Sequence, residues 1–273
     1  MLFSNLIVSI VIALAFFFIA KKAYAIADRE GTDFAGLSSI DIHHNDPLKV
    51  ATFNIQTGKN GKGVRNIQTT AELISDQHII GIQEIYAPGW LNKLGFGQSQ
   101  LAALSAGKSF HSLMAATRRR WFREQRGNAV LSRLPINKWR IKGLPDYTGK
   151  SFRNMSICEF VWQNKPVVFI NTHLHTSKGR EEQLEIVLAE FTKHPTAILV
   201  GDFNSKRETP ALTRALQEAG VNDAINSITR DNQDTANRID WILTKGFNTV
   251  GGKIVDEGVS DHPYYEVSLT LVR

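Results

Sequence analysis

The sequence predicts one α/β domain in which packed β-sheets are covered on the outside by helices. From residue 48 onward, short apolar runs alternate with stretches of helical periodicity, which is typical of α/β architecture. Several of these runs, such as 167–170 and 197–200, contain no polar residue, as expected of strands covered on both faces. No internal repeat interrupts this pattern, so we expect a single folded unit.

The expected elements can be placed along the chain from these patterns. Helical patterns occupy 65–76, 180–193 and 208–219, and in the second of them apolar residues recur with helical spacing from Leu184. Pro195 should end that helix, because the residue before a proline disfavours helical backbone. The expected strands are 48–54, 78–83, 128–132, 157–162, 166–172, 196–201, 239–243 and 264–271.

The composition is that of a globular protein with a local excess of positive charge. The 273 residues are 42% hydrophobic and 21% charged, which excludes disordered and collagen-like classes. The net charge of +6 comes from Lys21 and Lys22 and from the arginine-rich segment 118–126. Cys158 is the single cysteine, so we expect no internal disulfide, thiolate metal cluster or disulfide-linked partner. We expect a monomer.

The first 25 residues read as a signal peptide or a membrane anchor. Residues 6–20 form an uncharged apolar run, and Ala23-Tyr24-Ala25 supplies a small-x-small cleavage site. We therefore expect an exported protein, periplasmic or secreted, or one held in a membrane through residues 6–20. The two lysines after the run leave open an anchor that keeps the domain in the cytoplasm. Residues 26–47 read as a tether, and the domain is expected at 48–273.

Polar side chains gather at the ends of the predicted strands, where α/β sheets usually hold their ligands. A single one of them would more often be a turn or capping residue than a catalytic group. Together they form an oxygen-rich set without cysteine, which suits Mg²⁺, with Mn²⁺ or Ca²⁺ as alternatives, rather than zinc. The set comprises Asn54, Glu84, His173, Asp202, Asn204, Asp240, Asp261 and His262.

Seven short motifs in a fixed order resemble the endonuclease/exonuclease/phosphatase superfamily. This group includes DNase I, the abasic-site endonucleases, the toxin subunit CdtB, neutral sphingomyelinases and inositol polyphosphate 5-phosphatases. The resemblance extends from about Val50 to Val272 and implies a four-layered sandwich of two mixed β-sheets flanked by helices. The motifs are TFNIQ (52–56), IQE (82–84), GNAVLSRLPI (127–136), NTHLHT (171–176), GDFN (201–204), RIDWI (238–242) and SDHPYYEV (260–267).

The resemblance implies a metal-dependent phosphoesterase and a role for each matched residue. Glu84 resembles the principal metal-ligating carboxylate, supported by Asn54, with Asp261 beside the metal. Asp202 resembles the carboxylate that orients the attacking water, and Asn204 a donor to the scissile phosphate.

The remaining matches concern the histidines and the phosphate. His262 resembles the acid/base histidine, with Asp240 fixing its tautomer, and His173 resembles a donor to a non-bridging phosphate oxygen. Asn128 and Arg153 fall where the family places polar contacts to the phosphate. The helix beginning with Arg180-x-x-Gln183 also fits the family pattern, in a structural role.

The arginine-rich segment favours a nucleic acid as the substrate, with a DNA endonuclease as the leading expectation. Interleaved arginines and aromatic rings suit a phosphate backbone and base stacking. The segment contains Arg118, Arg119, Arg120, Trp121, Arg123 and Arg126.

Two other readings stay open. A basic loop also suits anionic lipid headgroups at a membrane surface, and His175 resembles the sphingomyelinase form of its motif, so a phosphoinositide phosphatase or sphingomyelinase-like enzyme is the alternative. A catalytically inert binding module is disfavoured, because the acidic groups and histidines are all present.

Overall fold

The structure is a computed structural model that describes most of the chain. The described residues are 2–21, 24–25, 27–32, 46–60, 62–87, 99–106, 109–119, 125–149, 152–229, 237–256 and 258–273.

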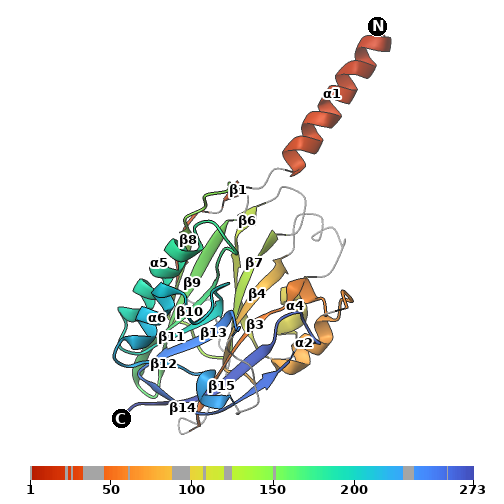
Figure 1. Ribbon diagram of the computed structural model, residues 1–273. Coiled ribbons are helices and arrows are strands. Elements are labelled where there is room, and N and C mark those ends of the chain that lie inside the picture. The colour runs from red at the N-terminus through yellow and green to blue at the C-terminus, as the bar shows by residue number, and fades with distance from the viewer. Residues whose placement is uncertain are drawn as a thin grey trace.

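Two mixed β-sheets form the centre of the molecule (Figure 1). The first sheet has six described strands in the order β14 (Phe247–Val255), β15 (Tyr264–Leu271), β3 (Leu48–Asn54), β4 (Ile79–Ala87), β7 (Gln125–Ser132) and β5 (His111–Ala116). The second has seven in the order β12 (Val221–Asp223), β13 (Asp240–Lys245), β11 (Ala197–Asp202), β10 (Lys165–His173), β9 (Arg153–Trp162), β8 (Lys138–Leu144) and β2 (Arg29–Gly31). The pairs β3–β4 and β10–β11 are parallel.

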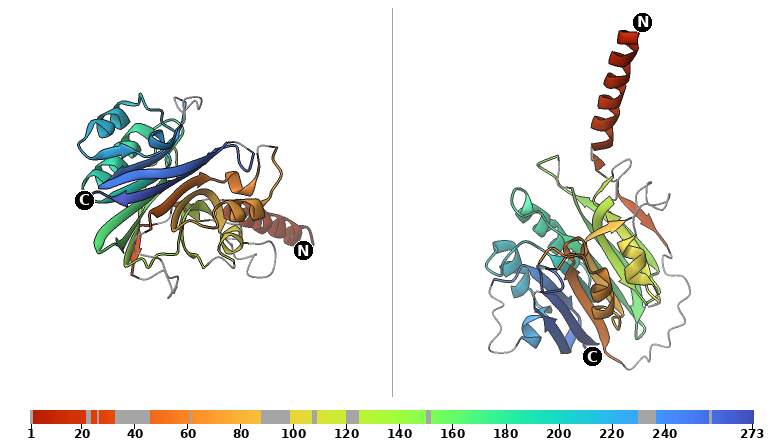
Figure 2. Two further views of the ribbon diagram at one scale, coloured as in Figure 1. Left: turned by 90° about the horizontal axis from the view of Figure 1, so that it is seen from below. Right: turned by 90° about the vertical axis from the view of Figure 1, so that its right-hand side faces the viewer.

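Helices cover the outer face of each sheet, as the two views in Figure 2 show. The helices α5 (Arg180–Thr192) and α6 (Pro210–Gln217) lie on the seven-stranded sheet, and α2 (Ile67–Leu73) and α4 (Gln100–Ser105) lie on the six-stranded sheet. Short 3-10 turns occur at η1 (Gln56–Gly58) and η2 (Asn226–Ile228). This arrangement confirms the predicted four-layered α/β sandwich.

The alternation of side chains along each strand separates the core into layers. On β11, Ile198 and Val200 point into the layer between the sheets, whereas Ala197 and Leu199 pack beneath the helices with Phe191 of α5. Because successive side chains of a strand point to opposite faces, a strand covered on both sides has no polar face. This explains the uninterrupted apolar runs in the sequence.

The predicted elements are present, and the structure adds others. The strands expected at 48–54 and 264–271 have those bounds, and the helix expected at 65–76 is the shorter α2. The strands β5, β8, β12 and β14 and the helix α4 were not predicted. β8 and β14 have exposed residues along much of their length, and β14 contains two adjacent glycines, so neither has the apolar pattern of a buried strand.

The amino-terminal helix α1 (Leu2–Lys21) stands clear of the two sheets (Figure 1), and its residues 7–18 are exposed. No helix among the described residues is both long and apolar enough to cross a membrane. After α1, β1 (Tyr24–Ala25) pairs with β6 (Arg118–Arg119).

The segment expected to be a tether, residues 26–47, contains the edge strand β2, which pairs with β8. The exposed backbone of β8 gives β2 its hydrogen-bond partners, and Arg29 Nη2 donates to the carbonyl of Met114 at 3.0 Å. Gly31 lies so close to the ring of Trp139 that a Cβ there would come within 2.7 Å of it. The attachment of β2 therefore depends on residues of other strands, and the periodicity of residues 26–47 does not indicate these contacts.

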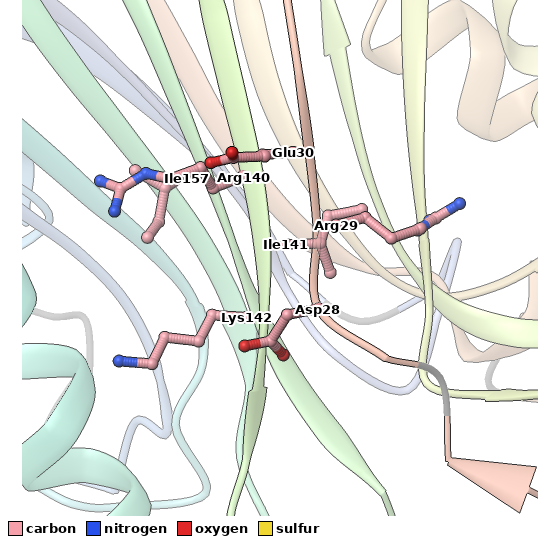
Figure 3. Close-up of a pocket in the computed structure, with 7 residues that line it drawn as sticks. All are labelled: Asp28, Arg29, Glu30, Arg140, Ile141, Lys142 and Ile157. Carbon is pink, nitrogen blue, oxygen red and sulfur yellow. The ribbon is translucent and has the colours of Figure 1, made fainter.

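A pocket of about 350 Å³ lies beside β2 and β8 (Figure 3). Its lining mixes both signs of charge and lies away from the strand ends that carry the sequence motifs. The lining residues are Asp28, Arg29, Glu30, Arg140, Ile141, Lys142 and Ile157.

Candidate active site

Three neighbouring strands bring His173, Asp202 and Asp240 into one row. In the pairing register, His173 at the end of β10 lies opposite Asp202 of β11, and Asp202 lies opposite Asp240 of β13. Two residues earlier on β11, Val200 belongs to the core between the sheets. Because side chains alternate along a strand, the row continues that inner face to the edge of the sheet.

The opposite sheet contributes Asn54 and His262 to the same place. Asn54, the last residue of β3, donates from Nδ2 to Asp202 Oδ2 at 3.0 Å. The same Asn54 Nδ2 lies 3.4 Å from His262 Nε2. His173 Nε2 lies 3.3 Å and His262 Nε2 lies 3.9 Å from the same carboxylate oxygen. The buried Asp202 carboxylate is therefore the point at which the two sheets meet.

His262 and Asp240 form the closest pair in this group, with 2.8 Å between Nδ1 and Oδ2. Burial alone would lower the pKa of His262, but the hydrogen bond and charge of Asp240, with the charges of Asp202 and Asp261, raise it to about 9. Asp240 thus fixes the tautomer and favours the imidazolium form. The other Asp240 oxygen, Oδ1, is buried and has no hydrogen-bond partner among the described residues.

The pKa values of Asp202 and His173 move in opposite directions. Burial, followed by the charge of Asp240, raises the pKa of Asp202 above its ordinary value. Burial, followed by the charges of Arg153, His262 and Arg126, keeps the pKa of His173 well below its ordinary value. The site therefore combines a carboxylate of raised basicity, a neutral imidazole and a readily protonated imidazole.

Glu84 reaches the site through an irregularity in β4. The pairing of β4 with β7 shifts between Ile82 and Ile85, and Glu84 has a φ of 59°. Before this bulge, Ile80 and Ile82 face the helices, and regular alternation would send Glu84 the same way. A bulge re-aims a side chain, and here the Glu84 carboxylate forms an ion pair with Arg126 of β7.

The loop residues beside the site also have unusual backbone conformations. Gln56, Thr57 and Asn204 have positive φ values, which cost about 1–3 kcal/mol for non-glycine residues. The Asn204 backbone N–H donates to Asp202 Oδ1 at 2.9 Å, and Asn204 Nδ2 donates to the carbonyl of Leu174 at 3.1 Å. These bonds hold the loop after β11 against the loop after β10.

Asp261 is held by residues of the Asn54 loop. Gln56 Nε2 donates to Asp261 Oδ2 at 2.5 Å, and the Gln56 backbone N–H donates to Asn54 Oδ1 at 3.1 Å. Ser260 Oγ donates to the carbonyl of Asn54 at 2.7 Å. Neither Gln56 nor Ser260 was assigned to the site from the sequence, although both lie inside quoted motifs.

The chemistry of the donor groups fits a hard divalent cation. Glu84, Asn54 and Asp261, the predicted ligands, offer carboxylate and amide oxygens. A second group, Asp202, Asp240 and His262, has one ligand atom from each residue within 4.8 Å of the others. The three ligand atoms of this second group lie close enough to share a cation, and neither group contains a thiolate.

The predicted phosphate contacts Asn128 and Arg153 lie on β7 and β9, which belong to different sheets. Asn128 is buried and donates from Nδ2 to Asn154 Oδ1 at 3.3 Å. Arg153 is half-buried, and its charge acts on His173. Asn154, which sequence reasoning missed, bonds to the carbonyls of Ala115 and Ala116 and so ties the two sheets together.

The histidine and glutamine next to this site have structural contacts. The His175 backbone N–H donates to Gln183 Oε1 at 2.9 Å, and Gln183 Nε2 donates to the carbonyl of Pro145 at 2.6 Å. His175 Nδ1 accepts from the backbone of Ser177. These bonds agree with the structural role expected for Gln183.

Part of the arginine-rich segment lies outside the described residues. This applies to Arg120, Trp121 and Arg123, and for Arg118 and Arg119 only the backbone in β6 is described. Arg126 is described, and it lies at the site itself. Sequence reasoning placed it among the substrate-binding arginines but missed its pairing with Glu84, because a bulge in β4 creates that contact.

The fold and this site define a phosphoesterase of the endonuclease/exonuclease/phosphatase type. A model of the Endonuclease/Exonuclease/phosphatase family matches residues 51–262, so the chain belongs to this family. Members of the family are hydrolytic phosphoesterases that typically depend on a divalent metal. Comparison of the sequence with curated proteins finds no match.

Solved structures of this family share the fold. A protein from Beutenbergia cavernae is 22% identical with a TM-score of 0.67, and the match covers 83% of this chain and 72% of that one. A protein from Bacteroides vulgatus is 17% identical with a TM-score of 0.63, over 82% and 99% of the chains. A mannosyl-6-phosphatase from Bacteroides thetaiotaomicron is 18% identical with a TM-score of 0.59, over 82% and 100%. At these identities the likeness concerns the fold alone.

Proposed function

We propose that this protein is a divalent-cation-dependent phosphodiesterase that cleaves nucleic acid, with DNA as the leading substrate. The observation that carries the phosphoesterase chemistry is the arrangement around Asp202, where one carboxylate oxygen faces Asn54 and two histidines. Hydrolysis of a phosphodiester requires an oriented water, neutralisation of the phosphoryl oxygens and stabilisation of the leaving oxygen. The three requirements can be assigned to different parts of the site.

Asp202 and His262 act on the same side of the phosphorus. The attacking and leaving oxygens lie roughly in line on opposite sides of the phosphoryl group. Asp202 Oδ2 and His262 Nε2 are only 3.9 Å apart, which is too close for one to face the attacking water and the other the leaving oxygen. Asp202 therefore orients the water and accepts its proton, and the imidazolium of His262 donates to a phosphoryl oxygen beside it.

Two further donors serve the phosphoryl group. His173 is neutral and donates one N–H, and Asn204 Nδ2 keeps a second hydrogen after its bond to the carbonyl of Leu174. A divalent cation held by Glu84, Asn54 and Asp261 would supply Lewis-acid stabilisation of the leaving oxygen. With these roles, no side chain is assigned to donate a proton to the leaving oxygen.

The nucleic-acid preference rests on the arginine-rich segment. Its last residue, Arg126, lies at the site. Arg118 is only eight residues earlier in the chain, so the whole segment is close in sequence to the place where a polyanion would bind. Arginines on a backbone-binding loop give affinity with little sequence specificity.

The experiment incubates residues 26–273 with supercoiled plasmid in the presence of Mg²⁺ or EDTA. Phosphoinositide, sphingomyelin and mannose 6-phosphate are tested in parallel, the last because a structural neighbour is a mannosyl-6-phosphatase. We expect Mg²⁺-dependent nicking that falls by at least about 100-fold in His173→Ala and in Asp202→Asn, within the usual effect of an acid–base or oxyanion group. Lipid turnover without nicking would replace the nuclease with a lipid phosphoesterase.

We also propose that residues 6–20 direct export or hold the protein at a membrane. The exposed apolar residues 7–18 of α1, which stand clear of the folded domain, support this proposal. The mass of the protein recovered from its native cells tests it. Processing after Ala25 is the expected result, and an intact amino terminus in a soluble fraction would contradict it.

A further inference from the structure

Arg126 holds the carboxylate that the predicted cation site requires. Arg126 and Glu84 lie on the paired strands β7 and β4, where Arg126 is the register partner of Tyr86. Arg126 Nη2 donates to Glu84 Oε2, and Glu84 is the only partner of this guanidinium among the described residues. The two side chains are 35% and 20% exposed, so the pair lies at the surface of the site and is open to exchange.

A guanidinium and a divalent cation cannot share this carboxylate oxygen. Both are positive and both require the same lone pairs of Glu84, so their charges would repel at contact distance. A half-exposed ion pair is weak, because solvent screens it and both side chains lose rotamer freedom. An incoming cation therefore has a modest barrier to displacing Arg126, whose stem is long enough to turn away.

A phosphate bound at the site would give the displaced guanidinium a new partner. The charge of Arg126, together with burial and with Arg153 and His262, already lowers the pKa of His173. Arg126 thus lies within electrostatic range of the residue proposed to contact the phosphoryl group. Guanidinium groups bind phosphate oxygens strongly, and frequently through two hydrogen bonds.

We propose that Arg126 exchanges between Glu84 in the free protein and the substrate phosphate in the loaded site, and thereby couples cation binding to phosphate binding. Without phosphate, Arg126 competes with the cation for Glu84. With phosphate, Arg126 leaves Glu84 and the cation binds more tightly. Linkage makes the effect reciprocal, so the cation also increases the affinity for phosphate. This inference rests on the proposed cation-dependent function.

The test measures Mn²⁺ binding by calorimetry, with and without methyl phosphate, which is a minimal phosphate ester. In the wild type, methyl phosphate should increase the Mn²⁺ affinity by about 5-fold or more, the usual scale of coupling between two sites. Arg126→Gln should bind Mn²⁺ about 5-fold or more tightly than the wild type without methyl phosphate, and adding the ester should change little. The backbone bonds of Arg126 to Thr117 remain in this variant, so we expect it to fold.

Arg65→Gln is the matched control. Arg65 is an exposed arginine that lies over the ring of Tyr86, 6.0 Å from the ring centroid. Its replacement by glutamine therefore removes the same charge close to β4. Its Mn²⁺ affinity and the effect of methyl phosphate should equal those of the wild type.

The outcomes separate this inference from the proposed function. Mn²⁺ binding that is lost in Glu84→Gln but unchanged in Arg126→Gln would overturn the role of Arg126 and leave the cation site intact. Mn²⁺ binding that survives Glu84→Gln would place the cation elsewhere and overturn the exchange. Absence of Mn²⁺ binding in the wild type and in Arg126→Gln would overturn both the inference and the proposed cation dependence.

Discussion

At the scale of single residues, the pair of Asp240 and His262 determines the protonation of the site. The hydrogen bond at 2.8 Å joins a buried carboxylate to an imidazole that is otherwise disfavoured as a cation by burial. Asp202 and Asp261 add negative charge from two other directions. The imidazolium is therefore a property of the assembled group and not of any single neighbour.

Asp240→Asn should lower the pKa of His262. The wild-type value of about 9 exceeds the ordinary value of 6.5, because the charged form is stabilised in the folded protein. Removing one negative charge in direct contact should shift the titration downward by about one pH unit or more. NMR of the cation-free protein measures this shift, with the resonance assigned by its loss in His262→Gln.

The exposed Asp256→Asn variant is the control, because it removes a carboxylate that does not contact the imidazole. An unchanged titration of His262 in Asp240→Asn would contradict the assignment of Asp240 as its main charged partner.

At the scale of elements, the strands beneath the site are joined by a buried polar bridge. Gln83 of β4 donates to Asn171 Oδ1 of β10 at 2.8 Å, and Asn171 donates to the carbonyls of Ile82 and Ala129. Each bridging residue is adjacent or close in sequence to a site residue, Gln83 to Glu84 and Asn171 to His173. The bridge fixes the distance between the two sheets where the site forms.

Gly81→Ala should destabilise the protein by about 1–3 kcal/mol, which is the usual effect of overpacking. A Cβ at Gly81 would lie 2.5 Å from Val200 Cγ2 and 2.6 Å from Asn171 Oδ1, so it would push the sheets apart at the bridge. Urea denaturation measures the change. Gly251→Ala is the control, because no atom of the described part of the chain lies within 4 Å of a Cβ there, and its effect should stay within about 0.5 kcal/mol.

His78, at the turn before β4, should make stability fall in mild acid. Burial and then the charges of Lys49 and Arg133 lower its pKa from 6.5 to about 4. Between these two values the unfolded chain binds more protons than the folded protein, so stability decreases as the pH falls from about 6.5 to 4. Urea midpoints between pH 7.5 and 4.5 should therefore decline less in His78→Gln than in the wild type.

An equal decline in both proteins would show that other groups carry the acid sensitivity. The change of the urea midpoint with pH is compared, and not the midpoint at one pH, because His78→Gln also disturbs the hydrogen bond that Nδ1 accepts from the Lys49 backbone.

At the scale of the whole molecule, the net charge of +6 is concentrated and should act through salt-dependent binding. Replacing Arg118, Arg119 and Arg120 by glutamine should weaken DNA binding without changing the site chemistry. The slope of log K against log salt should decrease by about 0.9 for each phosphate contact that is lost. Binding of a duplex between 50 and 200 mM salt measures this slope.

A variant with the same change in net charge serves as the control. Lys138, Lys142 and Lys253 are exposed residues of β8 and β14, and their replacement by glutamine removes three charges elsewhere. Equal slopes in the two variants would show that the total charge, and not the arginine-rich segment, sets the affinity for DNA.

Much of the site could be predicted from the sequence because its residues lie at the ends of strands with clear patterns. Asn54, His173 and Asp202 each end an apolar strand, and the structure brings them together as expected. The bounds of β3 were predicted because most of its residues are apolar and its end is polar. The edge strand β2 was not predicted, because an edge strand needs few buried side chains and so has a weak pattern.

The order of the apolar strands, the family and the types of chemical group at the site could be predicted from the sequence alone. Which of these groups come into contact depends on how the strands pair and how the two sheets pack. Asn54 and Asp202 are 148 residues apart in the chain, and their contact depends on the packing of two sheets. The row of His173, Asp202 and Asp240 depends on strand register. The pairing of Glu84 with Arg126 depends on a bulge in β4. Periodicity reports the environment of each strand separately, whereas register, bulges and sheet packing arise from interactions between strands.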